Sequence, residues 1–270
     1  MALQYFSPYF NILASMPLTL KEFHTAITNI LPEYRELECE TLIEVMIGLH
    51  APIHRVTINN NQMVDTTTKS IDLETAKLCF VDIETTSSNV EQGQIIEIGA
   101  IITQNGKILD TFDTLVHSHF VPEEITELTG IDVYMLEDAP PLEKVLKQFR
   151  IFLGDCVFVA HNVGFDYNFI AESLYEYDMP PLFNARLCTL DISRKTLIAK
   201  KHGLAYLNSM LGINTAQAHR AYADALTSFE LYKICMQSFP KKVRTLQGLI
   251  DFSKGKITYP KYLTNETNLC

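Results

Sequence analysis

The chain has 270 residues, 47% hydrophobic and 20% charged, so it is long enough to bury one large core or two modest ones and has the composition of an ordinary folded protein. Its net charge of −10 does not suggest a protein that coats nucleic acid by bulk electrostatic attraction, but it does not exclude one that holds a chain end through metal ions. No stretch approaches the ~18 consecutive apolar residues of a membrane span, and the six cysteines form no CxxC pair, so we expect a cytoplasmic protein with free thiols and no membrane contact.

The first part of the chain, residues 1–75, is predicted to form a small, mainly helical module. Residues 18–31 and 36–49 have helical apolar spacing, and residues 53–66 have the pattern of a β-hairpin. Two helices followed by a hairpin allow a winged-helix-like module. Acidic residues outnumber basic ones here, which argues against DNA binding, so we expect a docking or capping module.

Residues 76–237 have the pattern of an α/β domain. A strand is predicted at 78–84, and two further apolar runs follow, joined by Asn105-Gly106, a strong hairpin signal. A short helix is expected at 122–131 and a buried strand at 156–160. Longer helices are expected at 142–153, 166–177, 188–200, 203–211 and 220–237. The predicted fold class is therefore α/β, with a mixed sheet flanked by helices.

Acidic residues occur at three places in this domain where a purely structural explanation is awkward. Asp82 and Glu84 lie two residues apart in the first strand, so they share one face of the sheet. Burying two like charges costs several kcal/mol unless something neutralises them. Asp166 lies at the start of an apolar helix. Taken alone, a carboxylate at this position is common, because it stabilises the N-terminus of the helix. Asp224 lies on or beside the apolar face of the last helix, five residues after His219.

Together these residues resemble the four-acid set of the DEDD 3′–5′ exonucleases, in the subclass with a histidine in the third motif. The segments VDIETT, HNVGFDYNF and AHRAYADA are similar to the three motifs, in the same order, over roughly residues 76–237. The resemblance implies an RNase H-like mixed sheet whose first strand bears the paired acids. The members that the chain resembles most are the epsilon-type proofreading subunits of bacterial DNA polymerase III. One departure is Ser87, where family members usually have glycine.

The chemistry of phosphodiester hydrolysis accounts for such a set of acids. The reaction needs a nucleophile at neutral pH and stabilisation of charge on the oxygens, which two divalent ions about 3.5–4 Å apart supply. Hard ions such as Mg²⁺ or Mn²⁺ prefer oxygen ligands, hence carboxylates. By the resemblance, Asp82 bridges both ions, Glu84 and Asp224 hold the ion with the attacking water, and Asp166 holds the second ion. His219 is the candidate general base, since an imidazole titrates near neutral pH.

The resemblance also implies a set of substrate-binding residues around the motifs. The segment ITELTGI is similar to the family's loop that meets the terminal nucleotide. The implied residues are Ile83, Thr85, Thr86, Thr129, Gly130, His161, Asn162 and Phe165. For His161 and Asn162 a hydrogen-bonding structural role is an equal alternative.

Residues 238–270 are predicted to be a basic C-terminal tail. The segment Gln247 to Phe252, QGLIDF, resembles the short peptide with which bacterial replication proteins dock on the sliding clamp. An ordinary amphipathic helix explains the same pattern.

The leading functional hypothesis is a metal-dependent 3′–5′ exonuclease. It would release nucleoside monophosphates from the 3′ end of DNA, most naturally single-stranded, in proofreading or repair beside a polymerase catalytic subunit. One alternative is RNA 3′-end trimming by the same chemistry, because the choice of sugar depends on pocket shape. Another is a polymerase- or clamp-associated binding subunit, against which the complete motifs count.

Overall fold

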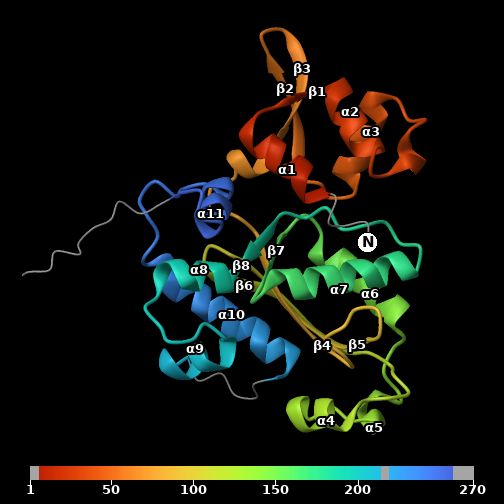
Figure 1. The fold of residues 1–270 in the computed structure, drawn as a ribbon, viewed down its shortest axis with the longest axis vertical. Coiled ribbons are helices and arrows are strands. Elements are labelled where there is room, and N and C mark those ends of the chain that lie inside the picture. The colour runs from red at the N-terminus through yellow and green to blue at the C-terminus, as the bar shows by residue number, and fades with distance from the viewer. Residues whose placement is uncertain (1–5, 214–218, 258–270) are drawn as a thin grey trace, which may run out of the picture.

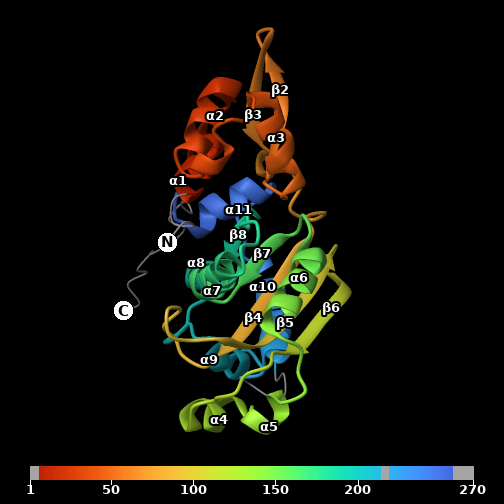
Figure 2. The ribbon, with the colours of Figure 1, turned by 90° about the vertical axis from the view of Figure 1, so that its right-hand side faces the viewer.

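The computed structural model describes residues 6–213 and 219–257, in which a small N-terminal module stands on a larger α/β domain (Figure 1). In the turned view the module forms a separate layer above the sheet, with helix α11 (Leu246–Ser253) between the two parts (Figure 2). Within the described ranges, none of the helices is both long and apolar enough to cross a membrane.

The N-terminal module combines three helices with a small antiparallel sheet. Its elements are α1 (Phe6–Ser15), β1 (Leu18–Thr19), α2 (Leu20–Thr28), α3 (Cys39–Gly48), β2 (Ile53–Ile58) and β3 (Asn61–Thr66), with strand order β1-β3-β2. Thr19 and Glu22 form a capping box that fixes the start of α2. The structure thus adds α1 and β1 to the predicted helices and hairpin. The resulting order is helix–strand–helix–helix–strand–strand.

The larger domain is built on a five-stranded mixed sheet with strand order β6-β5-β4-β7-β8. Its strands are β4 (Leu78–Thr85), β5 (Ile95–Gln104), β6 (Lys107–Leu115), β7 (Val157–Ala160) and β8 (Arg186–Cys188). Strand β4 pairs antiparallel with β5 and parallel with β7. Asn105 and Gly106 both adopt positive φ angles, which makes the tight turn between β5 and β6. The RNase H-like mixed sheet predicted from the sequence is confirmed.

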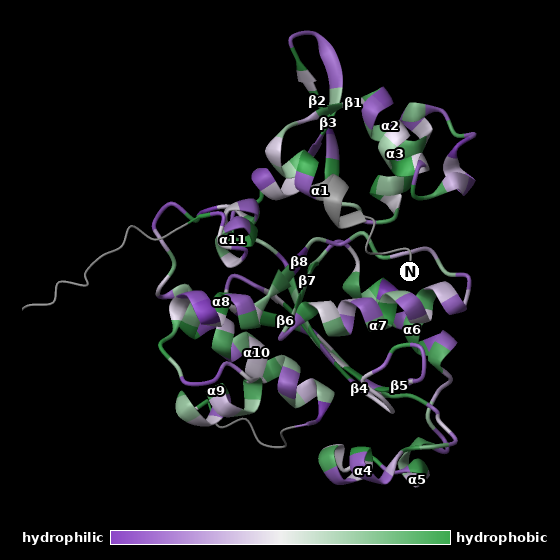
Figure 3. Ribbon diagram, in the orientation of Figure 1, coloured by the Kyte–Doolittle hydropathy of each residue, from purple (hydrophilic) through white to green (hydrophobic). Residues whose placement is uncertain are grey.

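The helices of this domain cover both faces of the sheet and also extend beyond one end of it, where α4 (Glu123–Thr129) and α5 (Val133–Leu136) lie (Figures 1 and 2). The others are α6 (Leu142–Leu153), α7 (Val163–Glu176), α8 (Thr189–Thr196), α9 (Leu204–Met210) and α10 (Ala221–Met236). Hydrophobic and hydrophilic residues alternate along α6, as expected of a helix that packs on a sheet with one side only, whereas α10 is buried on several sides (Figure 3).

Strand β4 contributes alternate residues to two separate cores. Those packed in the core with α6 and α7 are Cys79, Val81 and Ile83. Those packed in the core with α10 and α11 are Leu78 and Phe80. The Phe80 ring lies 5.3 Å from the ring of Phe229 and 5.5 Å from that of Tyr232, both on α10. Alternation therefore places the next even-numbered residues, Asp82 and Glu84, on the side of α10.

The described part of the predicted tail, residues 238–257, contains a packed helix. The apolar side chains of α11 that are buried are Leu246, Leu249, Ile250 and Phe252. Gln247 accepts a hydrogen bond of 2.7 Å from Thr68 in the linker between the two parts. The segment that resembles a clamp-binding peptide thus uses its apolar residues in the domain's own core, which argues against clamp docking through it.

If α11 is part of the core, truncating one of its buried side chains must cost stability. We expect Leu249→Ala to lower the free energy of unfolding by about 2–5 kcal/mol, because Leu249 has no exposed surface. Leu128→Ala, in helix α4 with 52% of the residue exposed, is the matched control and is expected to change it by less than about 1 kcal/mol. Urea unfolding followed by circular dichroism measures both. Equal small effects would mean that α11 is not part of the core.

Candidate active site

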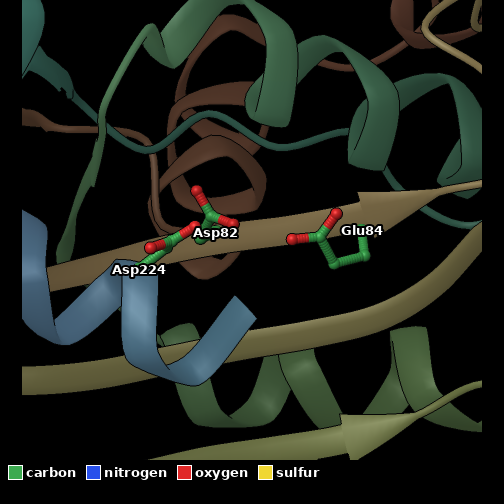
Figure 4. A group of neighbouring side chains, drawn as sticks. All are labelled: Asp82, Glu84 and Asp224. Atoms are coloured by element: carbon green, nitrogen blue, oxygen red, sulfur yellow. The ribbon is translucent and has the colours of Figure 1, made fainter. Parts of the chain in front are cut away.

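Three carboxylates from two elements converge at one end of the sheet. Asp82 and Glu84 come from β4, and Asp224 from the first turn of α10 (Figure 4). One ligand oxygen of each lies within 4.8 Å of the others. Since the aromatic contacts of Phe80 hold β4 against α10, the acids are brought together by the core packing behind them.

Asp166 approaches the same place from another element. It lies in the first turn of α7, directly after β7, the parallel neighbour of β4, and only 2% of the residue is exposed. Its charge raises the pKa of both Asp82 and Glu84, so it lies within electrostatic reach of them. The sequence motifs therefore meet in space: three acids form a tight cluster and the fourth borders it.

His219 lies where the chain enters α10. Its backbone N–H donates a hydrogen bond of 3.1 Å to Oδ2 of Asp224. Its φ is 64°, a left-handed conformation that is uncommon outside glycine and is often found at functional sites. The backbone of His219 thus orients one of the clustered carboxylates.

Crowding and burial shift the titration of all four acids upward. Burial raises the pKa of Glu84 to about 8 and that of Asp166 to about 7. Burial, followed by the charges of the neighbouring carboxylates, raises the pKa of Asp82 well above its ordinary value. The pKa of Asp224 is also raised, chiefly by burial. The charged forms are therefore unfavourable without a cation among them.

Two further charged residues lie at the site. Glu97 is outside the three motifs, whereas Arg220 directly follows His219 in the third. Glu97 on β5 is the cross-strand neighbour of Glu84 on β4, and only 1% of Glu97 is exposed. The guanidinium of Arg220 forms an ion pair of 2.6 Å with Glu97. The only sequence signal for Glu97 is an acid inside an apolar strand, the same signal that singles out Asp82 and Glu84.

Among the residues implied to bind substrate, three are occupied by structural contacts. Ile83 is buried in the core on the other face of β4. The hydroxyl of Thr129 donates to the Ile125 carbonyl at 2.8 Å within α4. His161 contacts the hydroxyl of Thr189 at 3.0 Å and the carbonyl of His202 at 2.7 Å, so it links the end of β7 to two later segments. For His161 the structure favours the hydrogen-bonding structural role.

The other implied residues lie at the end of β4, in the turn that follows it, at the end of α4 and at the start of α7. The Thr85 hydroxyl donates to the Ser87 carbonyl at 2.8 Å, and the Thr86 hydroxyl accepts from Gln94 N–H at 2.9 Å. Gly130 ends α4 with a φ of 72°, and Asn162 precedes α7 with a φ of 78°. Phe165, in the first turn of α7, is half-buried, with its ring 5.7 Å from that of Phe169.

Ser87 occupies the turn after the first motif without strain. It is not among the described residues that have a positive φ. Its hydroxyl accepts the Asn89 N–H at 3.1 Å and so closes the turn locally. The backbone here does not need the conformational freedom of the glycine that the family usually has.

Comparison with known proteins gives a consistent assignment. The family model described as "Exonuclease" matches residues 79–232. The PolC-type DNA polymerase III of Staphylococcus saprophyticus is 36% identical over 205 residues, which is 74% of this chain but 14% of that protein. The corresponding Staphylococcus aureus protein is 36% identical over 173 residues, covering 63% and 12% of the two chains. This chain thus spans a small fraction of the length of these relatives.

Solved structures share the fold. Escherichia coli exonuclease I in complex with a dA16 oligonucleotide has a TM-score of 0.56 at 17% identity, covering 62% of this chain and 42% of that chain. A zinc-bound exonuclease I–ssDNA complex from the same organism also has a TM-score of 0.56 at 17% identity, covering 66% and 42%. At this level of identity the likeness concerns the fold alone.

The raised pKa values predict how stability depends on pH. Glu84 has a pKa of about 8 when folded against 4.5 ordinarily, so between these values the folded chain binds more protons than the unfolded one. The stability of the metal-free protein is therefore expected to fall as pH rises through this window. Adding Mg²⁺ or Mn²⁺ relieves the repulsion, so the increase in melting temperature is expected to be larger at about pH 8 than at about pH 5. Thermal unfolding with and without the ion measures this, and equal increases at both pH values would contradict it.

Proposed function

The chain belongs to the exonuclease family, and on that premise we propose that it removes nucleoside monophosphates from the 3′ end of DNA in a metal-dependent hydrolysis. The observation that carries the proposal is the cluster of Asp82, Glu84 and Asp224, with Asp166 beside it. No structural benefit explains four acids whose charges oppose one another. A site for divalent cations does explain them.

The donor set fits hard divalent ions. The close group consists of three carboxylates without sulfur or imidazole, which suits Mg²⁺ or Mn²⁺. Asp82, Glu84 and Asp224 would hold one ion, and Asp166 together with Asp82 would hold a second. When bound, two such ions lower the pKa of the attacking water and stabilise charge on the phosphate oxygens.

His219 supplies the proton transfer in this proposal. A general base must lie within reach of the attacking water, and His219 is tied to the metal-binding carboxylate Asp224 by its own backbone N–H. An imidazole with a pKa near neutrality can take up the proton that the water loses. We assign His219 as general base and the four acids as metal ligands.

The proposed substrate is single-stranded DNA. The relatives are DNA polymerases by name, and a structural neighbour holds a dA16 oligonucleotide. The residues left to contact the terminal nucleotide are Thr85 at the end of β4, Thr86 after it, Gly130 at the end of α4, and Asn162 and Phe165 at the start of α7. The backbone of these residues, more than their side chains, would form the surface that contacts the terminal nucleotide.

We further propose that the activity serves proofreading, with the chain acting like an epsilon subunit beside a DNA polymerase catalytic subunit. The support is the identity to PolC-type polymerases, in which the matching segment is 14% of a longer chain. Clamp docking through Gln247–Phe252 would require buried residues of α11 to leave the core, so we do not include it.

The direct test is a degradation assay with 5′-labelled oligonucleotides. With Mg²⁺ or Mn²⁺ we expect single-stranded DNA to shorten stepwise from the 3′ end, a mismatched duplex end to shorten faster than a matched one, and chelator to stop the reaction. A matched RNA oligonucleotide is expected to be degraded more slowly. An intact 3′ end on every substrate would disprove the proposal, and faster loss of RNA would favour the RNA-trimming alternative.

Asp82→Asn separates catalysis from stability. It removes a metal ligand, so we expect the rate to fall at least about 100-fold, the loss of several kcal/mol of transition-state stabilisation. It also removes a charge from the repulsive cluster, so the metal-free variant is expected to melt no lower than the wild type at pH 8. Asp110→Asn, an exposed carboxylate on β6, is the control and should change neither property. An active Asp82→Asn enzyme would refute the metal assignment.

A further inference from the structure

The start of α10 rests on two residues of β5 that belong to none of the three motifs. The cross-strand partner of Asp82 is Gly99, and the partner of Glu84 is Glu97. Cross-strand partners point to the same face of a sheet. Gly99 and Glu97 therefore lie beside the catalytic acids, on the face that α10 covers.

Gly99 allows the helix backbone to touch the strand. A Cβ added at this position would overlap the backbone of Ala221 and Tyr222, the first two residues of α10. Because these are backbone atoms and not the end of a flexible side chain, the overlap could be relieved only by moving the helix. Gly99 thus sets how closely α10 approaches β5.

Glu97 holds the same helix start by hydrogen bonds. Its Oε1 accepts from Nη2 of Arg220 at 2.6 Å and from Nε at 3.0 Å, and its Oε2 accepts the backbone N–H of Ala221 at 2.8 Å. Charge-assisted bonds of this kind are what a fully buried carboxylate requires. All of them go to the two residues where α10 begins.

Arg220 and the residue before it, His219, also hold Asp224 in place. The Asp224 N–H donates to the Arg220 carbonyl at 2.9 Å in the first helical turn, and the His219 N–H donates to the Asp224 carboxylate at 3.1 Å. Arg220 is therefore held by Glu97 through its side chain and supports Asp224 through its backbone. The chain of contacts runs from β5 to the third catalytic motif.

We propose that Glu97 is a positioning residue that sets Asp224 and His219 against Asp82 and Glu84 and is not itself a metal ligand. The proposal rests on the proposed metal-dependent function. Both carboxylate oxygens of Glu97 already accept hydrogen bonds, and Arg220 balances its charge. In the part of the chain that the structure describes, the close group of potential ligands does not include Glu97.

The competing explanation is an ordinary buried ion pair that stabilises the core and nothing more. Removing it would then lower the melting temperature without changing the affinity for metal. A positioning residue behaves differently, because losing such an outer partner typically costs about 10–100-fold in metal affinity or activity.

The test is Glu97→Gln, with Mn²⁺ affinity measured by titration calorimetry as the readout besides activity. We expect a 10–100-fold weaker Mn²⁺ affinity and a similar fall in kcat, with KM for the oligonucleotide changed less than about threefold. The control is Thr103→Val, which removes a buried hydrogen bond to the Leu78 carbonyl at the far end of β5 and should leave both values unchanged. Arg220→Lys keeps the charge but loses the forked contact, and we expect it to fall between Glu97→Gln and the wild type. If Glu97→Gln does not fold, Arg220→Lys replaces it as the test variant.

A double-mutant cycle tells positioning from ligation. If Glu97 acts through Asp224, Glu97→Gln should weaken Mn²⁺ binding less than about twofold when Asp224→Asn is already present. An undiminished effect in that background would show that Glu97 is itself a ligand, and an unchanged affinity with a lower melting temperature would show a core ion pair only. Either result overturns the proposal.

Hydrogen exchange of the metal-free protein tests the role of Glu97 without depending on metal binding or activity. Glu97→Gln should speed exchange in the peptide that contains residues 221–225 more than Thr103→Val does. If the wild type binds no metal, the proposed function fails, and the exchange comparison still decides whether Glu97 positions the helix.

Discussion

The mutual repulsion of the clustered carboxylates is the constraint to which the rest of the domain responds. Asp82, Glu84 and Asp224 would separate if their side chains were free, since their ligand oxygens lie within 4.8 Å of one another. The packing of β4 against α10 prevents this, with Phe80 between Phe229 and Tyr232. The packing of the apolar part of β4 thus offsets the destabilising repulsion among the acids, which a bound cation would reduce.

Strand periodicity and motif spacing make most of the site predictable. Side chains two apart in a strand must share a face, so the amino-acid order by itself places Asp82 and Glu84 together. Asp166 and Asp224 are recognisable only because their contexts resemble a family, since each alone is an ordinary helix-terminal carboxylate. Glu97 cannot be found this way, because its importance depends on which residue of a distant helix start lies over it.

Other parts of the fold are harder to predict from the sequence, because they depend on tertiary packing. The amphipathic pattern of Leu246 to Phe252 indicates a helix, but whether that helix docks on a partner or on its own domain depends on tertiary packing. The prediction for the N-terminal module did not include α1 and β1, which in the structure complete its sheet and core. There, Arg55 on β2 forms ion pairs with Glu40 and Glu44 of α3. Helix α3 is acidic, because its charged residues are Glu40 and Glu44.

The way the chain enters and leaves the nuclease domain has a topological consequence. Leu73 N–H donates to the Arg244 carbonyl at 2.8 Å, and Leu246 N–H donates to the Ile71 carbonyl at 3.0 Å, so the segment before β4 and the segment before α11 run side by side. A folded unit whose two connections lie next to each other can be inserted into a host polypeptide without pulling the host's flanking segments apart. The part of the chain that matches the exonuclease family, residues 79–232, lies between these two adjacent segments, an arrangement compatible with insertion into a longer polypeptide.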